Sequence, residues 1–202
     1  MKKENILEIK VKKLDERAVI PSYAHNGDVG MDMIAIDVEY DEKNDMYIYH
    51  TGLAFESDFN VGQFLFVRSS NCKTDAYLCN HVGIADSAIY RGEIQFRFKN
   101  RESIENLAYR EAMKQFIFSL NMTSRMDSTL KLNKHIELAS EMYNDVEKDV
   151  KERAKKLEFA PYEVGDKIGQ MVFNFYPTVK LNVVEELSST DRGEGGFGST
   201  GK

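Results

Sequence analysis

The sequence predicts a mainly β domain that is interrupted by a pair of long helices. Short segments in which apolar and polar residues alternate lie on both sides of residues 101–160, and turn-forming Gly and Asn residues separate them. Residues 101–160 instead space their apolar side chains as an α-helix does. Many short strands at such spacing indicate a sandwich or a jelly roll.

The expected strands follow the alternation along the chain. Residues 46–50 illustrate the pattern, because aromatic and β-branched side chains dominate this short run. Turns are expected at residues 26–28, 60–62 and 90–92, where a glycine accompanies Asn, Asp or Arg. We expect strands at residues 6–13, 46–50, 63–67, 93–98, 167–176 and 179–184.

Residues 101–160 are expected to form a helical hairpin inserted into the β domain. Apolar residues keep helical spacing as far as residue 120, and Ser103 or Asn100 can cap the first helix. After a break, a second helix is expected to begin near residue 128 and to end before Pro161. A helix of about thirty residues would be ~45 Å long, which is too long to serve as a loop.

The whole chain, residues 1–202, is expected to form a single domain. Without the insertion about 142 residues remain, which is enough for one compact β domain. Residues 188–202 contain five glycines and few side chains that can pack, so we expect a flexible C-terminal arm.

The bulk composition favours a soluble globular protein. Apolar residues make up 42% and charged residues 30% of the chain, a balance that argues against disorder. The net charge of -6 gives no basic surface for nucleic acid or for an anionic membrane. No segment approaches the ~20 apolar residues needed to span a bilayer, and the N-terminus lacks the apolar run of a signal peptide. Because only two cysteines occur, a reducing cytoplasm is the expected compartment.

Five segments stand out along the chain, and the residue types of two of them suit the binding of phosphate groups. Arg68 offers a planar guanidinium for phosphate oxygens, and two serines follow it. The glycines after Arg192 allow backbone N–H groups to gather around an anion, while Phe197 can stack on a planar ring. The five segments are residues 21–33, 68–71, 80–94, 165–171 and 192–202.

Taken together and in this order, the five segments resemble the signature motifs of the homotrimeric dUTP diphosphatase (dUTPase) family. The third segment contains the sequence ADSAIYRGE and is similar to the family's uracil-binding hairpin. The fifth, RGEGGFGSTGK, fits the family's C-terminal arm residue for residue and is the most specific. The helical insertion is similar to the extra segments that some phage members carry between the third and fourth motifs.

The resemblance implies a jelly-roll β-barrel and a role for each candidate residue. Asp86 would be the general base for the attacking water, and Asp32 would hold a Mg²⁺ ion through a water molecule. Asn80 and the backbone around Gly83 would bind uracil, while Tyr90 would lie under the deoxyribose. Further substrate contacts would come from Arg68, Ser69, Ser70, Gln170, Arg192, Phe197, Gly198, Ser199 and Thr200.

Two departures from the family pattern stand out. Ser70 and Asn71 replace the commoner Gly-Leu after the Arg-Ser pair. The family usually places its tyrosine three residues after the catalytic aspartate, whereas Tyr90 lies four residues after Asp86. Either the turn has an extra residue, or Ile89 takes the position below the sugar.

The implied activity is Mg²⁺-assisted hydrolysis of dUTP to dUMP and pyrophosphate, which limits uracil in DNA and supplies dUMP for dTMP synthesis. Three copies would build each site, and the arm at residues 188–202 would close over it. The alternative from another class is a regulatory protein, gated by the nucleotide, that binds a protein partner through residues 101–160. Simple packing of the helical hairpin on the β domain or on its trimer mates is the more economical expectation. The enzyme rival is a dCTP deaminase of related fold, but no deaminase-type acidic motif replaces the third segment.

Other clusters with metal-binding side chains are less informative. Cys72, Cys79 and His81 lie close in sequence, but no fourth zinc ligand follows at a suitable spacing. The remaining histidines, His25, His50 and His135, occur in unrelated contexts and are expected to be structural or at the surface.

Overall fold

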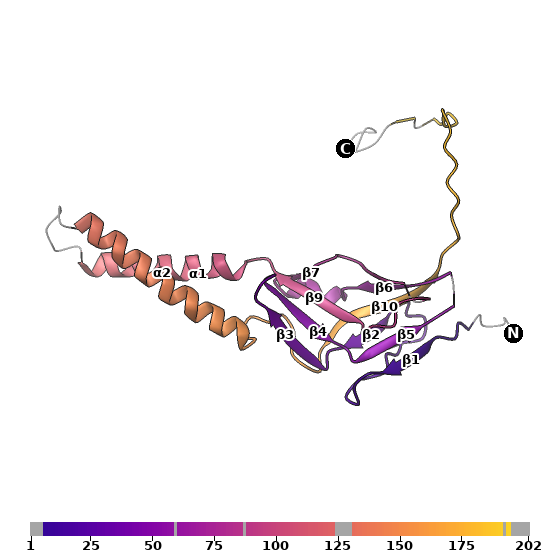
Figure 1. Cartoon of the computed structure of the whole chain (residues 1–202), viewed down its shortest axis with the longest axis horizontal. Coiled ribbons are helices and arrows are strands. Elements are labelled where there is room, and N and C mark those ends of the chain that lie inside the picture. The colour runs from indigo at the N-terminus through magenta and orange to yellow at the C-terminus, as the bar shows by residue number, and fades with distance from the viewer. Residues whose placement is uncertain (1–5, 59, 87, 124–130, 192, 195–202) are drawn as a thin grey trace.

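The computed structural model describes residues 6–58, 60–86, 88–123, 131–191 and 193–194 (Figure 1). Short strands dominate this part of the chain, and two long helices lie between the ninth and tenth strands. The strands are β1 (Lys10–Lys13), β2 (Met31–Ile34), β3 (Asp37–Asp41), β4 (Met46–His50), β5 (Leu53–Glu56), β6 (Val61–Phe66), β7 (Ala76–Leu78), β8 (Gly83–Ala85), β9 (Gln95–Asn100) and β10 (Lys167–Phe175). The helices are the 3-10 helix η1 (Ser69–Lys73), α1 (Ile104–Thr123) and α2 (Lys131–Lys155).

Two four-stranded antiparallel sheets form the β body. Their strand orders are β2-β10-β6-β8 and β3-β4-β9-β7, and β1 pairs with β5 in a separate two-stranded sheet. Alternation along β9 shows how the sequence directs this, because Phe96 and Phe98 are fully buried while Arg97 between them is exposed. The mainly β expectation is confirmed. The described strands form no closed barrel, because the two larger sheets are not hydrogen-bonded to each other.

Both large sheets contribute to one hydrophobic core. Met33, Ile168 and Met171 face it from one sheet, and Tyr49, Phe96 and Phe98 face it from the other. The sheets approach each other closely at Gly169, where a Cβ atom would overlap the ring of Phe96. Glycine is therefore required there by the packing of the two sheets.

The two helices form the expected hairpin, which projects from one side of the β body (Figure 1). Ser103 is the cap of α1, because its Oγ accepts a hydrogen bond from the Asn106 backbone N–H at 3.1 Å. The carboxylate of Asp45 accepts a second bond from the Ile104 N–H at 3.1 Å. Among the described residues, the hairpin's own core lies in the half nearest the body and comprises Ile104, Ala108, Ala112, Val146, Val150 and Ala154.

The base of the hairpin is fastened to the β body. Phe159 and Tyr40 pack against both the body core and the hairpin core. The side-chain amide of Asn100 donates to the Phe159 carbonyl at 2.8 Å. The helices therefore continue the packing of the body at this end.

The expected strand at residues 179–184 is absent, and this prediction is wrong for the described chain. The segment after β10 leaves the body as extended chain (Figure 1), with Leu181 and Val183 almost fully exposed. The alternation is real, but a strand needs a neighbour to take its backbone hydrogen bonds, and none lies beside it here.

The expected N-terminal strand is shorter than the alternation indicates, since only Lys10–Lys13 pairs. In the described residues, no helix is long and apolar enough to cross a membrane.

Candidate active site

The first, second and fourth predicted segments meet at the side chain of Asp32. Asp32 lies on β2 directly opposite Gln170 of β10, and the Gln170 amide donates to its Oδ1 at 3.2 Å. Arg68, just beyond the end of β6, donates from Nε to the same oxygen at 3.0 Å. Lys167 Nζ lies 2.8 Å from Oδ2. One carboxylate thus holds an amide and two cationic side chains; we call this group the Asp32 cluster.

The Asp32 cluster joins one mostly buried carboxylate to two cationic side chains. Only 9% of the Asp32 side chain is exposed. Burial by itself raises the pKa of this carboxyl, but hydrogen bonds from Lys167 and Gln170 lower it. The charges of Arg68 and Lys167 act in the same direction, so the pKa of Asp32 is lowered overall. The carboxylate is therefore ionised at neutral pH, and two cations remain beside it to attract phosphate.

The residues after Arg68 form a tight turn beside the Asp32 cluster. Ser69 begins the 3-10 helix η1 and is exposed, while Ser70 Oγ accepts from Arg68 Nη1 at 3.4 Å. A shallow pocket of about 350 Å³ opens here, lined by Arg68, Ser70, Tyr162, Gly165, Asp166 and Lys167. We call it the phosphate-side pocket, because its cations come from the segments expected to bind phosphate.

The third predicted segment lines a larger pocket of about 520 Å³. Asn80, Gly83, Asp86 and Tyr90 all lie in its wall, as expected for residues that act on one ligand. Asp86 is exposed, and its backbone carbonyl accepts hydrogen bonds from Ile89 and Tyr90, which close a turn. The remaining lining residues are Leu65, Leu78, Cys79, Ile84, Ala85, Glu93, Ile94, Gln95 and Arg97. We call this the nucleoside-side pocket.

Tyr90 rather than Ile89 faces this pocket. Ile89 is 74% exposed and is not part of the lining, whereas the Tyr90 hydroxyl donates to the Glu93 carbonyl at 3.0 Å. The Tyr90 ring lies over Gly92, where any Cβ atom would overlap it. The extra residue between Asp86 and Tyr90 is thus accommodated within the turn.

Several lining residues were missed in the sequence. Lys167 and Gln170 should face opposite sides of a regular strand, but a shift in the β10–β2 register between Lys167 and Gly169 brings both to Asp32. The sequence gives no sign of this irregularity.

Glu93 was passed over although it lies within the third segment. Its carboxylate joins His50 Nδ1 at 2.8 Å and accepts from the Gly52 N–H at 2.7 Å. Burial raises the pKa of Glu93, but these contacts lower it, and the pKa is lowered overall.

The candidate base Asp86 and Arg68 lie toward opposite ends of β6. Ala85 pairs with Gln63 near the start of this strand, and Asp86 follows Ala85 directly. Arg68 lies five positions after Gln63, roughly 17 Å further on at about 3.3 Å per residue. The two pocket linings share no residue. Within one chain, the candidate base and the Asp32 cluster therefore do not form a single site.

Five of the predicted site residues lie outside the described residues: Arg192, Phe197, Gly198, Ser199 and Thr200.

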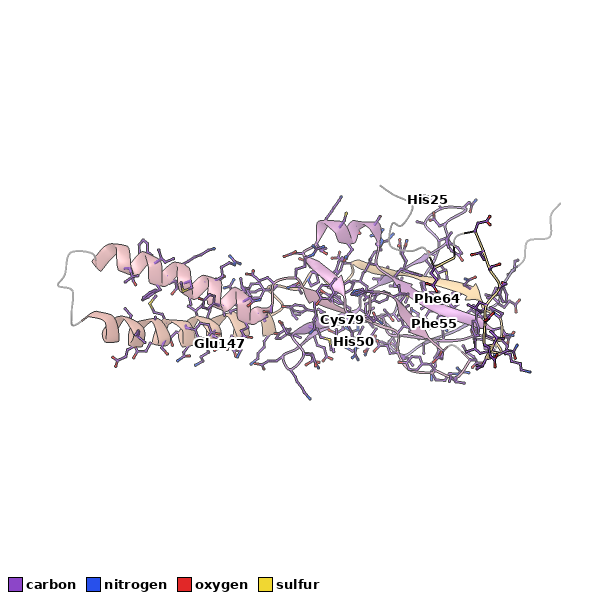
Figure 2. All side chains as sticks on the ribbon, turned by 90° about the horizontal axis from the view of Figure 1, so that it is seen from above. His25, His50, Phe55, Phe64, Cys79 and Glu147 are labelled. Atoms are coloured by element: carbon purple, nitrogen blue, oxygen red, sulfur yellow. The ribbon has the colours of Figure 1, made fainter. Side chains whose placement is uncertain are left out.

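No group of three or more His, Cys, Asp or Glu side chains suited to a metal ion occurs among the described residues. His25 lies well apart from His50 and Cys79 (Figure 2). The Asp32 cluster nevertheless fits Mg²⁺ bound mainly by waters and phosphates, because such sites need only one or two carboxylates.

The chain is similar to known dUTPases over nearly its whole length. The dUTPase family model matches residues 155–201. The deoxyuridine 5'-triphosphate nucleotidohydrolase of Trichodesmium erythraeum is 29% identical over 96% of this chain and 99% of its own length. A Staphylococcus bacteriophage 80alpha dUTPase mutant with dUpNHpp shares the fold, with a TM-score of 0.60, 21% identity, and coverage of 96% and 99%. The dUTPase of phage phi11 of S. aureus, described with a structural Mg(II) ion, gives a TM-score of 0.53 at 19% identity, with coverage of 89% and 97%.

Proposed function

We propose that this chain, which belongs to the dUTPase family, hydrolyses dUTP to dUMP and pyrophosphate. The observation that carries the proposal is the presence of both halves of such a site. Asp86 lies in a pocket whose volume suits a nucleoside, and Arg68 and Lys167 lie in a second pocket beside a buried carboxylate. We place this activity in the cytoplasm, since Cys72 and Cys79 are both free thiols.

In the reaction, the chain's own residues position dUTP and move one proton. Asp86 accepts a proton from a water molecule as the water oxygen bonds to the α-phosphorus. The bond from the α-phosphorus to its bridging oxygen breaks at the same time, and pyrophosphate leaves with the electron pair. Ser69 donates to that bridging oxygen, while Arg68 and Gln170 bind the phosphates.

Asp32 is the residue that we expect to hold Mg²⁺, through a water molecule. When bound, the ion neutralises the triphosphate and orients it. The low exposure and lowered pKa of Asp32 keep this carboxylate charged and fixed for that role. Removal of divalent cations with a chelator should therefore raise the Kd for a non-hydrolysable dUTP analogue.

Each complete site is proposed to form between copies of the chain in a homotrimer. The phosphates of one nucleotide are adjacent, but Asp86 and Arg68 of one chain lie toward opposite ends of β6. The segment after β10 also exposes Val179, Leu181 and Val183, as expected if a second copy covers it. The C-terminal arm would then reach a site on a neighbour.

A mixing experiment tests the shared site. Asp86→Asn and Arg68→Ala chains should each be nearly inactive, but co-expressed chains should regain activity. With random assembly, about one quarter of the sites receive both wild-type halves, so activity should return to roughly that fraction. No recovery in mixed trimers of confirmed composition would show that each site lies within one chain.

One assay tests the reaction itself. Pyrophosphate and ammonia release should be measured with dUTP, dCTP, dTTP and UTP, each with and without Mg²⁺. We expect pyrophosphate from dUTP alone, in a Mg²⁺-dependent manner, and no ammonia. Ammonia from dCTP would favour the deaminase, and equal rates with dTTP or UTP would contradict the uracil and deoxyribose selectivity.

A second role as a nucleotide-gated regulator is favoured by one feature of the hairpin. Tyr109, Met113 and Ile117 are exposed and spaced four apart along α1, so they form an apolar stripe on one helix face. A protein partner bound there should respond to dUTP or its analogue. Substitution of the stripe by serine should abolish such binding and leave hydrolysis intact.

A further inference from the structure

The turn that follows Arg68 is built differently from the family pattern. Ser70 and Asn71 stand where the resembled motif usually has Gly-Leu. The Asn71 backbone N–H donates to the Arg68 carbonyl at 2.9 Å, and the Thr74 N–H donates to the Asn71 carbonyl at 3.0 Å. Asn71 therefore lies at the centre of the turn that carries Ser69 and Ser70.

The side chain of Asn71 is held on both sides of its amide. Its Nδ2 donates to the Ala76 carbonyl at 3.2 Å, which ties the turn to the start of β7. Its Oδ1 accepts from the Tyr162 hydroxyl at 2.8 Å and from Thr74 Oγ1 at 3.3 Å. Of these partners, Tyr162 alone comes from a distant part of the chain.

Tyr162 is itself firmly anchored. The Tyr49 hydroxyl donates to the Tyr162 carbonyl and accepts from the Tyr162 N–H, each at 2.9 Å. The Tyr162 ring lies edge-on to Phe98, with centroids 5.2 Å apart, and is buried in the body core. Burial raises the pKa of the Tyr162 hydroxyl, so it stays protonated and remains a donor at neutral pH.

We propose that Tyr162 is a positioning residue for the phosphate-binding turn. Its hydroxyl fixes Asn71, and through Asn71 it fixes the direction in which Arg68 and Ser69 meet the triphosphate. Tyr162 lines the phosphate-side pocket with Arg68, Ser70 and Lys167, which places it at this turn and away from the nucleoside-side pocket. The inference rests on the proposed dUTP hydrolysis. It also explains how Asn71 is tolerated where the family pattern has an apolar residue.

The first test is Tyr162→Phe, which keeps the buried ring and removes only the hydroxyl. Loss of one hydrogen bond of this kind should raise the KM for dUTP about threefold to tenfold. We expect kcat to change less than about twofold, because phosphate contacts are made in both the ground and the transition state. The Ki of deoxyuridine, which has no phosphate, should be unchanged.

Tyr47→Phe is the matched control. The Tyr47 hydroxyl is buried and has no hydrogen-bond partner among the described residues, so its removal breaks no bond. KM and Ki should both stay at the wild-type value. An unchanged KM in Tyr162→Phe, or a parallel rise in the Ki of deoxyuridine, would overturn the proposal.

A double-mutant cycle with Asn71→Leu separates positioning from general stability. If the hydroxyl acts through Asn71, Tyr162→Phe should have no further effect on KM once Asn71 is replaced. Equal effects of Tyr162→Phe in both backgrounds would show that Tyr162 acts independently of Asn71 and would refute the proposal.

A measurement without turnover distinguishes this inference from the proposed function. Amide hydrogen exchange at Asn71 and Thr74 should accelerate about threefold to tenfold in Tyr162→Phe, and not in Tyr47→Phe. If wild-type protein failed to cleave dUTP while this exchange difference was found, the proposed function would be wrong but the role of Tyr162 at the turn would remain. Unchanged exchange would refute the positioning role whatever the activity.

Discussion

The phosphate side and the nucleoside side of the chain are held in place by different means. On the phosphate side, Asp32 binds side chains from β10 and from the segment after β6, so charge fixes the geometry. On the nucleoside side, Asp86 projects from a turn closed by its own backbone carbonyl. The comparison indicates that the cationic groups are already oriented in the free protein, whereas the position of the proposed base depends on turn geometry.

Asp86→Asn should have the largest effect, because it removes the proton acceptor and leaves the turn intact. We expect kcat to fall about 100-fold or more, the usual scale for a lost acid–base group, with little change in the Kd for a dUTP analogue. Asp75→Asn, an exposed aspartate outside both pockets, is the control and should be fully active. Near-normal turnover by Asp86→Asn would remove Asp86 as the base.

Asp32→Asn should be the next most severe change and should act on stability as well as on hydrolysis. Two cations would lose their counter-charge, which should lower the free energy of unfolding by about 1–3 kcal/mol at pH 7. Because the folded-state pKa of Asp32 is lowered, its contribution is present above the unfolded pKa and is lost as pH falls through the folded pKa. The difference between wild type and variant, measured by urea unfolding, should therefore shrink below pH 3.8. A difference that is constant with pH would contradict the ion-pair explanation.

Gly92→Ala should have a moderate effect confined to the nucleoside side. The added methyl group would displace the Tyr90 ring, which we expect under the deoxyribose. A lost ring contact should raise the KM for dUTP about threefold to tenfold, with Tm almost unchanged. Tyr90→Phe keeps the ring and should be nearer to wild type. Equal effects of the two variants would point to the hydroxyl as the important group.

The smallest effect is expected from the outer face of the hairpin. Replacement of Tyr109, Met113 and Ile117 together by serine should leave kcat/KM within about twofold, and stability nearly unchanged, because exposed side chains contribute little. Val150→Ala in the buried face should by contrast cost about 2 kcal/mol, measured by thermal unfolding. A large kinetic defect in the triple-serine variant would show that the active site extends onto the hairpin.

Much of the architecture could be predicted because it depends on local periodicity. The expected strand at residues 46–50 matches β4, and Ser103, one of the two expected caps, is the cap of α1. The short strands β2, β5, β7 and β8 were missed, since three or four residues carry too little alternation to detect. β3 was missed as well, although its five residues alternate. The strand expected at residues 179–184 failed for the opposite reason: the pattern is present, but no strand of the described chain pairs with it.

The candidate site was predictable only as a set of segments. The resemblance to the dUTPase motifs singled out Asp32, Arg68 and Gln170, and the structure brings them together. Lys167 joins them through a register shift that no sequence rule shows. The proposed role of Tyr162 likewise depends on tertiary contacts, because its partner Asn71 is far away in sequence.

The position of the hairpin core has a consequence for how the insertion can vary. Among the described residues of the hairpin, the buried side chains lie within residues 104–112 of α1 and 146–154 of α2, next to Phe159. The described turns further out, residues 113–120 and 136–145, carry no buried side chain and can therefore be shortened in matched pairs, or exchanged for another sequence, without exposing the interior of either part. The inner turns have no such freedom, and this boundary gives protein engineers a defined place to graft a new module.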